Sequence, residues 1–192
     1  MIDTPAAAPP PPAIEAVMRE QALAVGYASA SAREGFAALL DLDHQLASIL
    51  QSTTEPMIGQ MRLTWWYEVL EKLDREPVPA HPVLQRLAAS VLPSGVRGAD
   101  LAPMIEGWEA LLDDGEPLDD TRVERHAEAR GGVLFASIGR LLGQAGMAPL
   151  GAAWAKADLA QHVSDVAIRA RIGTAASSEL DAALTEKAPK TV

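Results

Sequence analysis

The chain has 192 residues, of which 48% are hydrophobic and 22% charged, and its formal net charge at pH 7 is −10. This length and composition are typical of one globular domain with a hydrophobic core. The acidic charge argues against nucleic acid as the main partner, because phosphate binding needs clustered lysine and arginine. The sequence has no cysteine, which excludes disulfides and cysteine-ligated metal sites.

No run of about 18 uncharged apolar residues occurs, so we expect no transmembrane segment. The first residues lack the basic and apolar regions of a secretory signal. Together with the lack of cysteine, these features predict a cytoplasmic protein.

Alanine and leucine dominate the apolar residues, and no alternating β-branched runs occur, which predicts an all-α fold. We expect a disordered Pro/Ala-rich tail at 1–12, one helical domain at 13–187 and a second tail at 188–192. The pattern "SARE", from Ser31 to Glu34, is a capping box that should begin the second helix. Prolines, glycines and polar turns place the helices at about 12–30, 32–51, 56–74, 82–92, 100–112, 120–142 and 150–172, with a last short helix after 177.

Arg62 lies among apolar residues of the predicted helix 56–74, and Asp43 lies in the apolar stripe of the preceding helix. The short loop 52–55 predicts that these helices are antiparallel neighbours, with the two residues at about the same level. Either Asp43 and Arg62 form an ion pair across the hairpin, or Arg62 lies at a groove edge with its guanidinium in water. The stripe expected to face inward comprises Ile58, Met61, Trp65, Val69 and Leu73.

Four segments then resemble one known family. "RLTWWYEVLEKL" (62–73) is similar to the Arg-Leu-x-Trp-Trp-x-x-x-Leu segment of the squalene/phytoene synthase family. "MIEGWEALL" (104–112), "HAEARGGVLFASIGRLLG" (126–143) and "GAAWAKADLAQHVSD" (151–165) resemble later segments of that family in the same order. The resemblance implies a single-domain helical bundle, a shortened isoprenoid synthase fold. In that fold two Asp-rich helices face each other and hold Mg²⁺ on a diphosphate.

The chain departs from that family at both Asp-rich motifs. Aligned on these segments, the first motif falls on Ala47, Ser48 and Gln51, which carry no carboxylate. The second begins at His162, a poor ligand for Mg²⁺. Asp158, His162 and Asp165 are expected to share one helix face, but one acidic cluster does not replace two. We therefore predict no metal and no cofactor.

Within the family, the chain most resembles a non-catalytic branch that lacks the Asp motifs and is tied to respiratory complex I assembly. This resemblance implies an assembly or scaffold factor with respiratory-complex subunits as partners, in peripheral contact with the inner face of the membrane. Two alternatives stay open: a divergent prenyltransferase that condenses prenyl diphosphates with Mg²⁺ on Asp43, Asp158 and Asp165, and an isoprenoid- or lipid-binding module.

Four further residues are candidates for pocket lining. Trp65 and Trp66 either fill the core or its rim, or contact a lipid. Gly131 and Gly132 lie inside a predicted helix, where each costs about 1 kcal/mol relative to alanine. Close helix packing is the favoured reason for this glycine pair, and a backbone opening toward a ligand is the alternative.

Overall fold

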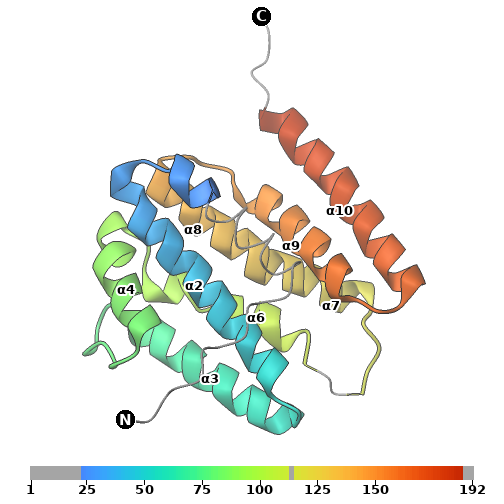
Figure 1. Cartoon of the computed structure of the whole chain (residues 1–192), viewed down its shortest axis with the longest axis horizontal. Coiled ribbons are helices and arrows are strands. Elements are labelled where there is room, and N and C mark those ends of the chain that lie inside the picture. The colour runs from blue at the N-terminus through green and yellow to red at the C-terminus, as the bar shows by residue number, and fades with distance from the viewer. Residues whose placement is uncertain (1–22, 113–114, 188–192) are drawn as a thin grey trace, which may run out of the picture.

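The computed structural model describes residues 23–112 and 115–187, so the predicted tails at 1–12 and 188–192 lie outside the described residues. Helices joined by short loops make up most of the described chain, and no strand occurs in it (Figure 1). The all-α prediction is confirmed. None of the described helices is both long and apolar enough to cross a membrane.

The helices follow one another along the chain with short connections. They are α2 (Ala30–Ser52), α3 (Pro56–Lys72), α4 (Pro82–Ser90), the 3₁₀ helix η1 (Leu92–Ser94), α5 (Gly98–Leu101), α6 (Met104–Glu109), α7 (Asp120–His126), the π-helix η2 (Ala127–Gly132), α8 (Val133–Leu142), α9 (Ala148–His162) and α10 (Val166–Lys187).

Most predicted helix boundaries agree with these elements, because proline and glycine act locally. Pro56 and Pro82 begin α3 and α4, and Gly143, with φ of 66°, ends α8 in the left-handed conformation that suits glycine. The predicted capping box is wrong: α2 begins at Ala30, and Ser29 occupies its N-cap position without a side-chain cap. The hydroxyl of Ser31 instead lies 3.1 Å from that of Ser29.

The predicted helix 150–172 is also wrong, because α9 ends at His162 and a separate helix, α10, starts at Val166. The Asp165 carboxylate accepts hydrogen bonds from the backbone N–H groups of Ala167 (2.8 Å) and Ile168 (2.9 Å). A capping carboxylate of this kind begins a new helix, since it satisfies N–H groups that the first turn leaves without partners.

Two apolar clusters hold the helices together. The main core joins α2, α3, α4, α6 and α8. A smaller cluster of Val123, Leu159, Ala160 and Ile172 joins α7, α9 and α10. In Figure 1, α3 and α4 lie on one side of α2, and α10 lies at the opposite outer edge of the molecule.

The face that α3 buries differs from the prediction. Most of the stripe predicted to point inward faces solvent, since Ile58, Met61 and Trp65 are 46%, 68% and 44% exposed. The neighbouring stripe, about 100° away on the helix, is the one that meets α5 and α6. Its buried residues are Gly59, Leu63, Trp66 and Leu70.

Candidate functional site

A buried arginine joins two carboxylates at the centre of the bundle. Arg130, on η2, donates from Nε and Nη2 to the two carboxylate oxygens of Asp43 on α2, each at 2.8 Å. Its Nη1 donates to Asp158 on α9 at 2.6 Å. Arg130 is 5% exposed and Asp43 1% exposed. Three charged groups from distant parts of the sequence therefore meet in one protected place.

Aromatic rings cover the guanidinium. The Cζ atom of Arg130 lies 4.4 Å from the ring centroid of Trp108 and 4.7 Å from that of Trp154, which are cation–π distances. Buried His126 completes the cluster: its Nδ1 lies 2.8 Å from the carbonyl oxygen of Gly107, and its Nε2 lies 3.3 Å from Nη1 of Arg130. With Nδ1 donating to the carbonyl, Nε2 is free to accept from the guanidinium.

The electrostatics follow from this burial. Burial lowers the pKa of Arg130, but the charges of Asp43 and Asp158 outweigh burial and raise it above its usual value. Burial first, and the positive charge of Arg130 second, lower the pKa of His126 to about 4. The imidazole is therefore neutral at pH 7, and the cluster of Arg130, Asp43 and Asp158 carries a formal charge of −1.

The local helix geometry brings these groups together. The π-helix η2 widens one turn of the long helix α7–η2–α8 at Arg130, and such turns recur at functional sites. Gly131 lies against Gly151 of α9, so closely that a Cβ on Gly131 would lie 2.0 Å from the Gly151 carbonyl oxygen. This is the close packing favoured from the sequence, and it brings η2 and α9 near enough for Arg130 to reach Asp158.

The predicted Asp43–Arg62 ion pair is wrong. Asp43 is bound by Arg130, 87 residues away in the sequence. Arg62 is exposed and donates to the hydroxyls of Ser52 (3.1 Å) and Thr53 (2.9 Å). The second interpretation, in which the Arg62 guanidinium lies in water, agrees with the structure, because Arg62 lies outside the buried face of α3.

The predicted face of Asp158, His162 and Asp165 does not form. Only Asp158 joins the cluster around Arg130. His162 is exposed, with Nδ1 2.8 Å from the backbone oxygen of Asp158, and Asp165 caps α10 beyond the end of α9. All three residues were expected on one helix. They separate because α9 ends at His162.

The two tryptophans of α3 have different surroundings. Trp66 is buried and packs edge to face against Trp65 and His81. Trp65 borders a small hollow of about 120 Å³ on the surface beside Lys72 and Pro77. The rings beside Arg130 are instead those of Trp108 and Trp154.

Arg130 was missed by sequence reasoning, although a signal for it exists. Val123, His126, Arg130, Leu134 and Ser137 recur at three- and four-residue intervals, and all five are buried. A charged residue inside such a stripe requires a buried counter-charge. The pattern could therefore have marked Arg130 as a buried charge that needs an acidic partner, although it does not say which acid that is.

The resemblance noted in the sequence implies Mg²⁺, but the residues at this place do not fit that ion. Ala47 and His162 are the positions at which the two Asp-rich motifs would begin, and Asp43 and Asp158 lie one helical turn before them. These two carboxylates face each other from α2 and α9 across Arg130. Their oxygens are bound to a guanidinium, which supplies the positive charge that a cation would bring. Elsewhere in the described chain, no group of three or more histidine and acidic side chains could hold a metal ion.

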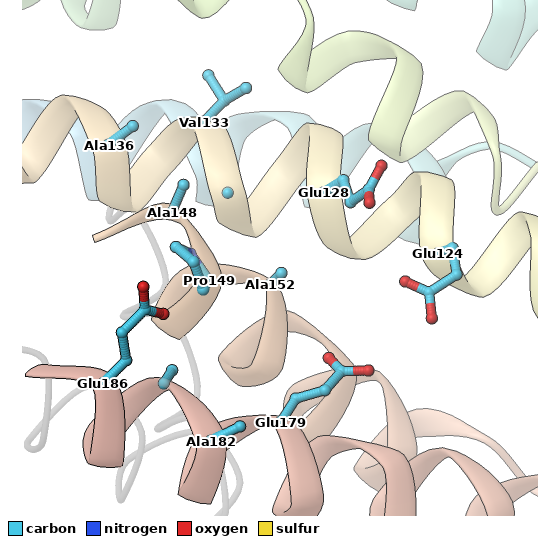
Figure 2. A pocket seen from close by; sticks show the side chains of 12 residues that line it. Glu124, Glu128, Val133, Ala136, Ala148, Pro149, Ala152, Glu179, Ala182 and Glu186 are labelled. Atoms are coloured by element: carbon cyan, nitrogen blue, oxygen red, sulfur yellow. The ribbon is translucent and has the colours of Figure 1, made fainter. Parts of the chain in front are cut away.

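A separate groove of about 700 Å³ runs between η2–α8, α9 and α10. Figure 2 shows Glu124 and Glu128 on one wall, Glu179 and Glu186 on the α10 wall, and Ala148, Pro149 and Ala152 of α9 between them. Gly132 lines this groove, whereas Gly131 packs against α9. The remaining lining residues are Val133, Ala136, Ala182 and Ala183.

The described residues form an all-α protein consistent with the isoprenoid synthase type of fold, in which Arg130 joins Asp43 of α2 to Asp158 of α9. The family model for squalene/phytoene synthase matches residues 14–174. The chain therefore belongs to the squalene/phytoene synthase family. Comparisons with curated proteins and with solved structures gave no match.

Proposed function

We propose that this chain is a non-catalytic member of its family, a scaffold or assembly factor that serves respiratory complex I. One observation carries the non-catalytic part: the guanidinium of Arg130 lies between Asp43 and Asp158, which face each other from α2 and α9. The complex I part comes from the sequence resemblance alone, which is an argument by analogy.

The chemistry of the cluster supports this proposal. Ionisation of a prenyl diphosphate needs several hard cations held by clustered carboxylates, which stabilise the leaving diphosphate. Here Arg130 makes charge-assisted hydrogen bonds to both carboxylates. A cation could reach the buried carboxylate of Asp43 only by displacing the guanidinium, which would lose these bonds and its contacts with two indole rings.

The non-catalytic role is tested by incubating the protein with a labelled prenyl diphosphate and Mg²⁺ and measuring diphosphate release. We expect no release above a protein-free control. Release that Asp43→Asn abolishes, while the matched variant Asp41→Asn on the same helix retains it, would instead identify a divergent prenyltransferase. Retention of the prenyl compound without release would favour a lipid-binding module.

The assembly role requires a test in cells of the source organism. A strain that lacks this chain should contain less assembled NADH dehydrogenase on native gels, and the wild-type chain should restore it. A normal level in the deletion strain would rule out the complex I role and leave the non-catalytic assignment standing.

A further inference from the structure

The groove between η2–α8, α9 and α10 has a floor of small side chains. Alanines and Gly132 cover most of it, together with Val133 and Pro149. Small side chains leave room for large ones from outside and let a second backbone come close. The groove has a volume of about 700 Å³.

The walls of the groove are acidic, and none of the described residues that line it is basic. Glu124 and Glu128 lie four residues apart on one wall, and Glu179 and Glu186 lie seven apart on the other (Figure 2). Buried Lys156 binds Glu124 (Nζ to oxygen 2.6 Å) and also Glu179, so these two are partly neutralised. Glu128 and Glu186 are exposed and have no ion-pair partner among the described residues.

We propose that this groove binds an amphipathic helix of a partner protein, with large apolar side chains on the floor and lysine or arginine against the glutamates. Carboxylates one and two helical turns apart match basic residues at the same spacing on an inserted helix. The inference rests on the proposed scaffold function, since the helix would belong to a protein that this chain holds.

The charges also argue against other occupants. Diphosphates and anionic lipid surfaces are repelled by the glutamates. The chain's own residues 1–22 contain three acidic residues and one arginine, and a second copy would bring a formal net charge of −10. These charges favour a basic segment of a different protein as the occupant.

The test is fluorescence anisotropy with the full chain and a labelled amphipathic peptide of about four helical turns, built from lysine, leucine and alanine. Binding should weaken about tenfold in the double variant Glu128→Gln/Glu186→Gln. It should also weaken in Ala152→Trp, which fills the groove. The matched control Glu34→Gln/Glu76→Gln changes net charge equally at exposed positions elsewhere and should bind like the wild type.

Several outcomes would overturn the proposal. The peptide could fail to bind, or the control pair could weaken binding as much as the groove pair does, which would mean general attraction to an acidic protein. Displacement by an unlabelled peptide of residues 1–22 would assign the groove to the chain itself. A dimer in ultracentrifugation that Ala152→Trp dissociates would assign it to a second copy. These measurements use purified protein and test the groove alone. The complex I role is tested separately by the level of NADH dehydrogenase in the deletion strain, so the two proposals can fail independently.

Discussion

Arg130 is a buried cation held by two carboxylates. Its guanidinium binds Asp43 and Asp158, lies at cation–π distance from two indole rings and has neutral His126 beside it. Buried ion pairs contribute little net stability compared with apolar packing, but breaking one is costly because the remaining charge stays buried. The cluster therefore acts mainly by fixing how α2, η2 and α9 meet.

Replacing Arg130 tests this role directly. Arg130→Met leaves two carboxylates without their cation, and we expect the free energy of unfolding in urea to fall by about 3–5 kcal/mol. The matched variant Arg62→Met removes an exposed arginine and should change it by less than about 0.5 kcal/mol. Equal effects of the two variants on the free energy of unfolding would contradict this role of Arg130.

His126 predicts how stability depends on pH. Its folded-state pKa is lowered from 6.5 to about 4, so between these values the unfolded chain binds a proton that the folded protein does not. The contribution of His126 should therefore lower stability as pH drops from about 6.5 to about 4, by roughly 3 kcal/mol. Urea unfolding at a series of pH values measures this slope.

Two variants isolate the histidine from the other titrating groups. In His126→Gln the slope over this range should become shallower, because the side chain no longer takes up a proton in the unfolded state. His162→Gln, which replaces an exposed histidine, is the matched control. A wild-type slope in His126→Gln would mean that other groups cause the acid sensitivity.

At the scale of elements, the contact between η2 and α9 decides the geometry of the site. Gly131 and Gly151 face each other, and a Cβ on either would lie 2.0 Å from the backbone oxygen of the other. Helices that touch through glycine can approach more closely than side chains would allow. This contact and the π-turn together place Arg130 within reach of both carboxylates.

The glycine contact gives a prediction about helix packing. Gly131→Ala should lower the free energy of unfolding by about 1–3 kcal/mol, because α9 must move to admit the methyl group. In the control Gly173→Ala, on α10, the methyl group meets no atom within 4 Å, and helix propensity should raise stability by about 0.5–1 kcal/mol. Thermal unfolding of both variants measures the difference. A Gly131→Ala variant as stable as the wild type would contradict the prediction.

Across the whole molecule, α10 is attached differently from the other long helices. The main core does not include it, and it packs through the small cluster around Ile172. Lys156 of α9, 1% exposed, adds ion pairs to Glu124 of α7 and Glu179 of α10. Burial lowers the pKa of Lys156, but the hydrogen bonds to these glutamates outweigh it and raise the pKa, so the lysine stays charged.

Removing this charge should loosen α10 alone. In Lys156→Met, amide hydrogen exchange in α10 should accelerate by about tenfold, while exchange in α2 stays unchanged. Lys72→Met, at an exposed position on α3, is the matched control. Faster exchange throughout the molecule would mean that Lys156 supports the global fold and not the attachment of α10.

Local chemistry in the sequence determined much of this structure. Composition predicted the all-α class, prolines and Gly143 set most helix boundaries, and periodicity placed Asp43 on the buried face of α2. These features depend on interactions within a few residues along the chain, which sequence patterns record directly. The segments that resemble the family lie within the residues that its model matches.

Tertiary packing alone decided which residues meet. Two stripes of α3 are apolar, and only the position of α5 and α6 selects the one around Leu63 and Trp66. The partner of Asp43 is 87 residues away, so no local spacing could choose Arg130 over Arg62. Charge neutralisation in a buried site depends on which helices cover it, and that is a property of the assembled bundle and not of any one segment.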